Sequence, residues 1–582
     1  MSLMKAPEMP TSIRSFRPRV LAVALSCCVA LSQLASATEL LSLVGADAAA
    51  CVHLKQAKTQ SQRLEASEFA RRIVNSTFYE NWQASPDSRK LRDVETVLTT
   101  LTGKPVRRTL EELFGQEALL ALYIGPGTQQ TAVLLLNAES PEALDAGLKH
   151  WQQLDQFEVT KRQHRDREYV RLSKTKGNGT YFYAADKTTL VLSEDESLIR
   201  RTLDLLLDQK AGSSLLTTPE AQAALQRGTE QDLLAVHLNP RAWDSTVLRP
   251  ENPLPPVVEQ SWRRCRWISL RASLNDDLAV SLTADYDGTE APDWWQRLAG
   301  MFAATELPID RLPENVVLAA TGKTSAASVR DLIQHLMGNR PVPKDIERAR
   351  RIARGLLLGL DPLDDVLPQL GPNWTAFVVP RAPAETTSFP ADGLIAIELR
   401  PAEKADKPTL HLALDNALTA SLNMIAALQN ARDTRETAIV GQRVVEGVTI
   451  RSVGPIGQFA PSVLVSDRTL VIASRPELCE QFLVAQKSTE RTAPALLAER
   501  AKSLARSGQL GFINVQAGRA WLTQRREWFL KQATKDNVTA DEAARRLKEF
   551  DELLSLLDGT YLTMSADQQL IEVKLGAIAR KP

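Results

Sequence analysis

The chain has few cysteines for its length, five in 582 residues. Two of them, Cys27 and Cys28, precede a predicted signal-peptide cleavage site, which leaves Cys51, Cys265 and Cys479 in the mature chain. Three thiols are too few for a disulfide framework in a protein of this size, and an odd number permits at most one disulfide within the chain. We therefore expect a fold that is held together by its hydrophobic cores.

The chain also lacks an excess of charge of either sign. Its 70 Lys and Arg residues equal its 70 Asp and Glu residues. Removal of residues 1–37 leaves 66 basic against 69 acidic residues, a net charge of −3. A nearly neutral surface provides no long-range field that would attract a polyanion. We therefore expect no nucleic-acid partner.

Compact catalytic and cofactor motifs are missing as well. There is no Gly-x-Ser-x-Gly elbow and no His-Glu-x-x-His motif, and the glycines are too dispersed for a dinucleotide fingerprint. The segment Thr321–Ser325 resembles the end of a phosphate loop, but Val317 stands where that loop needs a glycine. The six histidines never occur at metal-ligand spacing. The sequence thus assigns no catalytic, metal-binding or cofactor-binding residue and no cofactor.

Two small groups of reactive residues have simpler structural interpretations. Cys51 and His53 would point to the same face of a strand, where a thiol and an imidazole could act as nucleophile and base. The apolar run around them favours burial instead. The carboxylates of Asp361, Asp364 and Asp365 could bind a hard cation. An N-cap followed by acids in the first helical turn explains these three residues equally well.

Long hydrophobic runs are restricted to the N-terminus. Basic residues up to Arg19 precede an apolar run from Val20 to Leu31, and Ala35-Ser36-Ala37 follows it. This pattern is typical of a signal peptide that is cleaved after Ala37, because the apolar run is too short to span a bilayer. We predict an exported protein, periplasmic or extracellular, whose mature chain contains no integral membrane segment.

The chain does contain one order of elements that occurs twice, at about residues 50–286 and 315–577. The clearest anchors are Asp186–Leu192 and Asp467–Ile472, each a polar turn that leads into an apolar strand. Each strand is followed by a Ser-x-x-Glu sequence, which predicts a helix that begins with a capping box. The matching pairs are Ser193 with Glu196 and Ser474 with Glu477.

Further predicted strands keep the same order in both halves. In the first half they cover residues 118–124, 131–136 and 233–238, and in the second half residues 375–379, 394–399 and 510–515. Each half ends in a hairpin pattern, 268–274 with 278–286 and 560–564 with 570–575. A repeat period near 270 residues indicates two large similar domains, since solenoids and propellers have much shorter periods.

These patterns predict an α+β fold of two similar halves, each a mainly antiparallel sheet packed with helices on one face. The predicted domains are a signal peptide at 1–37, a first α+β repeat at 38–300 and a second at 301–582. Hairpins and strand meanders dominate over alternating strands and helices, which disfavours a doubly wound parallel sheet.

Aromatic residues concentrate near the end of the first half, where five of the ten tryptophans lie within 53 residues. They are Trp243, Trp262, Trp267, Trp294 and Trp295. Such a group could pack inside or between the halves, or could form a surface for a ligand or a partner protein. Arg263, Arg264 and Arg266 also suggest a nucleic-acid stacking surface, but export and a net charge of −3 argue against it.

The element order and the two anchor segments, Asp186–Glu196 and Asp467–Glu477, resemble a family of exported bacterial envelope proteins of unknown function. The long chains of that family contain a duplicated α+β unit. The resemblance implies export and duplication. It implies no catalytic residues, since the family supplies none.

Three functions remain open from the sequence. The first is a non-enzymatic binding or scaffold protein for an unknown protein, glycan or lipid ligand in the cell envelope. The second is an exported hydrolase with an active site outside the known motifs, which would need a cluster of polar groups with shifted pKa values in a pocket. The third is a carrier of apolar ligands, which would need a large apolar cavity between a sheet and its helices.

Overall fold

The computed structural model describes most of the chain from Leu40 onward. The described residues are 40–114, 116–125, 129–152, 157–175, 179–207, 214–228, 232–251, 253–275, 277–289, 293–326, 328–331, 344–381, 390–400, 409–432, 437–454, 460–487, 493–504, 506–534 and 538–579. The predicted signal peptide at 1–37 lies outside them. Among the described helices, none combines the length and the apolar character needed to cross a membrane.

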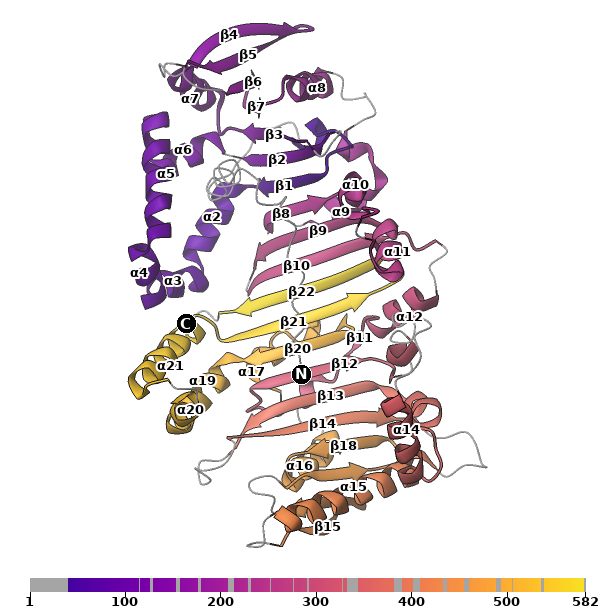
Figure 1. Cartoon of the computed structure of the whole chain (residues 1–582). Coiled ribbons are helices and arrows are strands. Elements are labelled where there is room, and N and C mark those ends of the chain that lie inside the picture. The colour runs from indigo at the N-terminus through magenta and orange to yellow at the C-terminus, as the bar shows by residue number, and fades with distance from the viewer. Residues whose placement is uncertain are drawn as a thin grey trace. The chain divides into compact units, whose positions relative to one another are not determined.

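The chain divides into two compact units (Figure 1). Unit 1 comprises Met1–Asn75 and Tyr79–Asn275, and unit 2 comprises Ser76–Phe78 and Asp276–Pro582. The structure is therefore a mixed α and β protein built on extensive antiparallel sheet.

Unit 1 contains an antiparallel sheet with the strand order β4-β5-β6-β7-β3-β2-β1-β8-β9. The strands are β1 (Ala50–Lys55), β2 (Glu117–Ile124), β3 (Gln130–Asn137), β4 (Phe157–His164), β5 (Arg167–Lys174), β6 (Thr180–Asp186), β7 (Thr189–Ser193), β8 (Asp232–Leu238) and β9 (Cys265–Leu274). The first strand in the sequence thus lies in the interior of the sheet, between β2 and β8.

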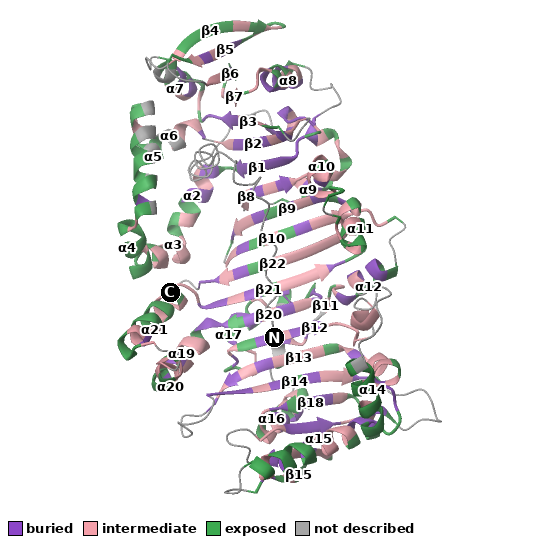
Figure 2. Ribbon diagram, in the orientation of Figure 1, coloured by how far each residue is buried: buried purple, intermediate pink, exposed green. Residues whose placement is uncertain are grey.

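Helices connect these strands. They are η2 (Leu40–Leu43), α2 (Ala57–Ala66), α3 (Glu68–Val74), α4 (Thr77–Ala84), α5 (Pro86–Thr102), α6 (Val106–Leu113), α7 (Pro141–Gln152), α8 (Glu196–Leu207), η4 (Leu215–Thr217), α9 (Pro219–Gln226), η5 (Pro240–Trp243), α10 (Asp244–Val247) and α11 (Pro256–Arg264). Figure 2 shows many exposed residues on α5 and on strand β4, whereas the middle strands contain most of the buried ones.

The prediction of helices on one face is wrong for unit 1, because helices cover both faces of its sheet. On β7, Val191 packs into a core with η2, α8 and α9, whereas its neighbour Leu190 packs into a second core with α7. Successive strand residues point to opposite faces, so these two cores lie on opposite sides of the sheet. The sequence carried this signal, since 118–124 is an almost unbroken apolar run, the pattern of a strand buried on both faces.

Unit 2 contains a second antiparallel sheet, with the strand order β15-β16-β17-β18-β14-β13-β12-β20-β21-β22-β10. The strands are β10 (Asp277–Tyr286), β12 (Leu318–Lys323), β13 (Leu370–Pro380), β14 (Ala391–Leu399), β15 (Ile439–Val445), β16 (Val448–Gly454), β17 (Ser462–Val465), β18 (Thr469–Ala473), β20 (Gln509–Asn514), β21 (Gly559–Ala566) and β22 (Leu570–Ile578). Two short strands, β11 (Thr305–Glu306) and β19 (Arg506–Ser507), pair separately.

The helices of unit 2 also lie on both sides of the sheet, but they cover one side only in part. They are α12 (Asp293–Met301), η6 (Ile309–Arg311), α14 (Lys344–Leu356), η7 (Pro362–Val366), η8 (Leu367–Gln369), α15 (Leu410–Arg432), α16 (Pro476–Lys487), α17 (Ala495–Ala498), α18 (Ala501–Leu504), α19 (Val515–Gln524), α20 (Arg526–Ala533) and α21 (Ala540–Leu554). One face carries a large core with α16, α17 and α18, and the other carries smaller cores under α14 and α15.

The strands expected from the sequence are present in both units, but the two predicted capping boxes are wrong. The Ser193 hydroxyl donates to the carbonyl of Ala132 on the neighbouring strand, and the Asp195 carboxylate accepts from the Ser197 amide instead, at the start of α8. The Ser474 hydroxyl likewise donates to the carboxylate of Asp392, at 2.9 Å. Each serine bonds to another strand, a partner that local sequence spacing cannot reveal.

The N-cap expected at Asp361 is confirmed. Its carboxylate accepts hydrogen bonds from the amides of Leu363 and Asp364, and the guanidinium groups of Arg350 and Arg354 pair with it. The Arg350 hydrogen bond is the main cause that holds the Asp361 pKa well below its usual range. Among the described residues, no group of three or more His, Cys, Asp and Glu side chains could hold a metal ion.

A buried ion pair lies at the start of β14 in unit 2. The Nε atom of Arg381 is 3.2 Å from both carboxylate oxygens of Asp392, and the two side chains are 1% and 9% exposed. Ser474 and Arg475 also bond or pair with this carboxylate. Arg381 precedes a connection to β14, so the pair fixes both ends of that connection to the sheet.

We expect the Asp392→Asn substitution to destabilise unit 2 by about 3–5 kcal/mol, because it removes the carboxylate that balances a buried guanidinium. Urea denaturation of the full mature chain measures the change as a lower midpoint. The matched control is Glu549→Gln, which removes a carboxylate that pairs with Arg545 on the surface. Equal midpoints for the two variants would contradict a structural role of the buried pair.

Candidate functional site

One face of the unit 2 sheet is open over most of its width. On β20, Leu510 and Phe512 point into the large core, and the alternate residues Gln509, Gly511 and Ile513 point to the other face. The same alternation holds on every strand from β18 to β10. The open face can therefore be followed from strand to strand through the paired residues.

Three rows of directly paired residues form this face. The central row is Ile472, Ile395, Ala376, Ala320, Gly511, Leu562, Leu575 and Val280. The second row is Gly393, Val378, Leu318, Ile513, Thr560, Ala577 and Leu278. The third row is Leu470, Ile397, Trp374, Gly322, Gln509, Met564, Val573 and Leu282. We call these residues the open face.

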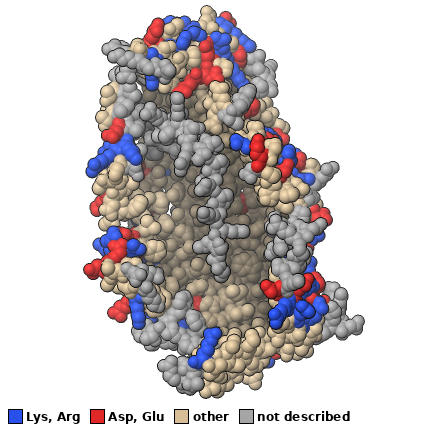
Figure 3. All heavy atoms as spheres, in the orientation of Figure 1, with Lys and Arg blue, Asp and Glu red and all other residues tan. Residues whose placement is uncertain are grey.

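No residue of the open face is charged, and most of its large side chains reach solvent, whereas Leu470 at the β18 end is buried under α15. The exposed fractions of Ile472, Ile395, Leu562, Leu575 and Val280 lie between 38% and 54%. In Figure 3, Lys, Arg, Asp and Glu atoms lie mostly toward the margins of the view, and the described surface between them is mostly uncharged. A contiguous exposed apolar area of this extent is rare on a soluble protein and marks an interaction surface.

Small residues occupy the middle of the open face. Ala376, Ala320 and Gly511 follow one another across three adjacent strands, with Ile395 on one side and Leu562 on the other. The row thus has low side chains in its centre and tall ones at its ends. The centre of the open face therefore projects less than its two ends.

Helix α15 limits the open face at one end. Its residues Leu410, Leu414, Leu422 and Ala426 are buried over strands β16, β17 and β18. The residues after α14 extend this cover over one end of β14, where Leu399 is buried in the same core. From β13 to β10 the exposed Leu318, Ile513, Leu562 and Leu575 show that this face remains accessible.

The five tryptophans are divided between the two units, three in unit 1 and two in unit 2. In unit 1, Trp267 is buried in the core, and the Trp243 and Trp262 indoles are half-buried. The Trp243 indole donates to the Ala49 carbonyl at 3.0 Å, and that of Trp262 donates to Asp244 at 2.8 Å. These bonds hold the residues after β8 against the sheet.

In unit 2, Trp294 and Trp295 are both buried on α12 and contact each other edge to face. The Trp295 ring also packs on Tyr286, with ring centres 4.2 Å apart, and its indole donates to the Gln568 carbonyl. Each tryptophan of this pair therefore packs within its own unit.

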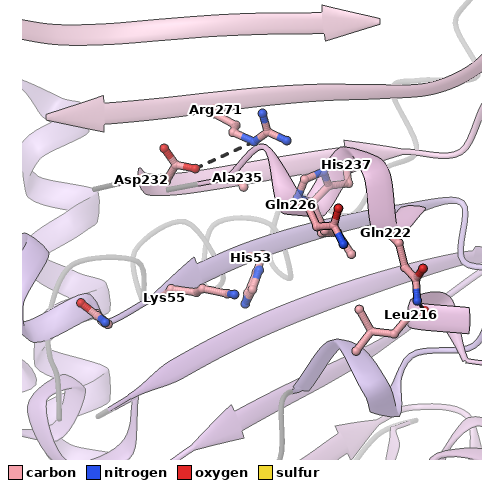
Figure 4. Close-up of a pocket in the computed structure, with 12 residues that line it drawn as sticks. His53, Lys55, Leu216, Gln222, Gln226, Asp232, Ala235, His237 and Arg271 are labelled. Atoms are coloured by element: carbon pink, nitrogen blue, oxygen red, sulfur yellow. Dashed lines mark hydrogen bonds and ion pairs between the residues drawn. The ribbon is translucent and has the colours of Figure 1, made fainter. Parts of the chain in front are cut away.

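Unit 1 contains a second feature of interest, a cavity of about 490 Å³ (Figure 4). It lies between α9 and the strands β1, β8 and β9. His53, Ala235 and Arg271 are paired in register across these strands and form one part of its wall. The residues that complete the wall are Lys55, Gln56, Leu216, Gln222, Leu225, Gln226, Gly228, Asp232 and His237.

Two histidine pairs support the cavity. The Nε2 atom of His53 is 2.6 Å from the Glu117 carboxylate, which also accepts from the amide of Leu40. The Nδ1 atom of His237 is 2.9 Å from the hydroxyl of Ser269. Burial lowers the His237 pKa to about 3, with a further contribution from the nearby Arg271 guanidinium, so this ring is neutral at physiological pH.

The residues that line the cavity include no hydroxyl or thiol side chain. Cys51 and Ser269 are 1% and 0% exposed. Burial raises the Cys51 pKa to about 12, which leaves its sulfur as an inert thiol. A ring with the pKa of His237 is too weakly basic to accept a proton efficiently near neutral pH. The predicted burial of Cys51 and His53 on one strand face is thus confirmed.

Both features escaped the sequence analysis for the same reason. The open face draws two or three residues from each of eight strands, and the cavity draws residues from β1, α9, β8 and β9. Only the strand order brings them together. A local signal existed for the open face alone, since 571–577 shows apolar residues at every second position.

His237 makes a testable contribution to acid sensitivity. The unfolded chain binds a proton at this site near pH 6.5, whereas the folded chain binds it only near pH 3. Stability from this residue is therefore full above about pH 6.5 and is lost as the pH falls. Between pH 7 and pH 4.5, we expect the wild type to lose about 2–3 kcal/mol more than His237→Gln.

Urea titrations of both proteins at the two pH values measure this difference. Carboxylates whose pKa is lowered in the fold, such as Glu196, act equally in both proteins and cancel. Equal losses in the wild type and the variant would contradict a neutral buried His237.

The sequence was compared with protein families, curated proteins and solved structures. Residues 93–446 match the family described as "Protein of unknown function (DUF3352)". Neither the curated proteins nor the solved structures provide a match. The match extends from α5 of unit 1 to the turn after β15 in unit 2 and covers more than half of the chain. The chain therefore belongs to this family of proteins of unknown function.

Proposed function

We propose that the protein is an exported, non-enzymatic binding protein whose open face takes the acyl chains of a lipid. The observation that carries this proposal is the uncharged, partly exposed set of residues across eight strands of unit 2. It joins two of the functions considered from the sequence, a binding protein of the cell envelope and a carrier of apolar ligands. The ligand site is an open sheet face where the carrier hypothesis expected an enclosed cavity.

The chemistry of the open face favours acyl chains over a partner protein. A protein interface usually combines an apolar centre with a polar rim and about one hydrogen bond per 100–200 Å². The open face offers few side-chain donors or acceptors, chiefly Gln509, Thr560 and Trp374. Backbone groups on this face are already paired in the sheet. A hydrocarbon ligand does not need hydrogen-bond donors or acceptors, because it binds through apolar contact alone.

The dimensions of the open face agree with this ligand. Eight strands at about 4.8 Å spacing extend over roughly 34 Å. The acyl layer of one leaflet is about 15 Å thick, half of a hydrocarbon core of roughly 30 Å. The open face is about twice as long, so an extended acyl chain fits along it. Each CH₂ group that leaves water contributes about 0.8 kcal/mol, so a long chain can bind without any polar contact.

We also propose that the two units are copies of one ancestral unit. The support is their strand order, in which β4-β5-β6-β7-β3-β2-β1-β8-β9 corresponds to β15-β16-β17-β18-β14-β13-β12-β20-β21. The residues after β8 and β20 agree as well. Asn239 and Asn514 each cap the helical turn that follows their strand. In unit 1, the apolar residues Val52, Val236 and Leu270 are paired in register on the three corresponding strands.

A hydrolase receives less support. Its active site would need a nucleophile or a base of suitable pKa in a pocket. In the cavity of unit 1, His237 is too acidic, and the nearby Cys51 and Ser269 are buried. Binding is therefore the function that the described residues favour.

Export is tested by the position of the mature N-terminus. The basic segment and the apolar run before Ala37 predict cleavage at that residue. Mass spectrometry of the protein from fractionated cells should find Thr38 at the N-terminus, outside the cytoplasm. We expect Val23→Arg to keep the precursor uncleaved in the cytoplasm, since it places a charge in the apolar run. A mature wild-type chain that still begins at Met1 would contradict export by this route.

Acyl-chain binding is tested with the fluorescent fatty acid cis-parinaric acid. We expect saturable binding to the mature protein, with the affinity lowered by at least about ten-fold in the double variant Leu562→Glu and Leu575→Glu. Leu562 and Leu575 are paired on the open face and are 41% and 54% exposed. Acidic side chains there should place negative charge on the open face without unfolding the sheet.

The matched control is Ile439→Glu, which places an acid on an exposed strand residue of β15 outside the open face. It should bind the probe as the wild type does. Absence of binding to the wild type, or equal binding by the double variant, would contradict the proposal. Extraction of the protein from its own envelope should also yield lipid, and a protein partner with no lipid would favour the scaffold function.

A further inference from the structure

The cavity of unit 1 is separate from the open face and has a different character. It combines charged, amide and apolar side chains, and its volume of about 490 Å³ falls within the roughly 300–1,000 Å³ of small-molecule sites. The fold does not require this polarity. In unit 2, β12, β20 and β21 occupy the same places in their sheet, and there Phe512 and Tyr561 fill the core.

Charges of both signs lie close together at one end of the cavity. The Arg271 guanidinium is 5% exposed, and its Nε atom is 3.9 Å from a carboxylate oxygen of Asp232. Arg271 also donates to the carbonyl of Ala224 in the last turn of α9, which fixes its direction. Lys55 lines the same end (Figure 4). The cavity thus presents two cations and one anion at a fixed separation.

This arrangement selects against ligands of a single charge. A simple anion would approach Arg271 and Lys55 but would also meet Asp232 and the negative end of the α9 dipole. A simple cation would approach Asp232 but would meet both basic groups. A ligand that carries an anion and a cation on neighbouring atoms satisfies both sides at once.

The other end of the cavity suits a side chain of mixed polarity. Gln222 and Leu216 lie on that side in Figure 4, and the Gln222 amide donates to the Leu216 carbonyl, which leaves its oxygen as an acceptor. Gln226 and Leu225 come from the same helix. This part of the wall offers both amide hydrogen bonds and apolar contact.

We propose that this cavity binds a free α-amino acid, with the carboxylate toward Arg271 and Lys55 and the ammonium group toward Asp232. The two charges of an α-amino acid are carried by groups on one carbon atom, as the neighbouring Arg271 and Asp232 require. Neutral His237 adds a hydrogen-bonding group without a further charge. The site is independent of acyl-chain binding by unit 2.

The test is calorimetric titration of the full mature protein with each of the twenty common amino acids at pH 7. We expect at least one to bind, and we expect Asp232→Asn and Lys55→Gln each to weaken it by at least about ten-fold. Ala235→Phe, which fills the cavity, should abolish binding. The matched control is Lys58→Gln, because Lys58 pairs with Glu139 outside the cavity and its loss should leave the affinity unchanged.

Analogues of the amino acid that binds separate the two charges. Its amine, which lacks the carboxylate, and its acid, which lacks the ammonium group, should each bind at least about ten-fold more weakly. Equal binding of the acid would overturn the proposal, as would binding that survives Ala235→Phe. Absence of binding by every amino acid would also overturn it. Acyl-chain binding is measured in the same preparations with cis-parinaric acid, so the two sites can fail separately.

Discussion

The structure depends on the alternation of side chains along antiparallel strands. Each strand offers one set of residues to each face, so one sequence can build a tightly packed core and a different surface on its two sides. In unit 2, Phe512 and Tyr561 belong to the core, while the adjacent Gly511 and Leu562 belong to the open face. A shift in pairing by one residue would exchange the two faces, and the large core prevents such a shift.

The same alternation explains how unit 1 and unit 2 can present different surfaces with a similar strand order. In unit 1 the row of His53, Ala235 and Arg271 faces the helical layer, where α9 leaves a cavity. In unit 2, Phe512 and Tyr561 fill the core between the corresponding strands, where unit 1 has His237 and Ser269. The open face of unit 2 instead lies on the opposite side of its sheet. Each unit therefore carries its accessible surface on a different layer.

Much of the fold could be predicted from sequence, and the limits have physical causes. Strands such as 118–124 and 510–515 were evident because a run of apolar residues between turn signals identifies a strand without tertiary information. Ser193 and Ser474 were misread because each bonds to a residue that is distant in sequence. Helices on both faces were missed, although the unbroken apolar run at 118–124 indicated them. The candidate sites required the strand order, which no local pattern contains.

The position of β1 has a consequence for the timing of folding. Ala50 pairs with Leu238, and the buried residues Leu40, Leu41 and Leu43 share a core with Trp267. β1 thus pairs early with β2 but completes its set of partners only when β8 and β9 have been synthesised. Contacts between distant residues fold slowly, because a long loop must close before they form. The architecture itself therefore delays completion of the unit 1 sheet until the strands at the end of that unit have been synthesised.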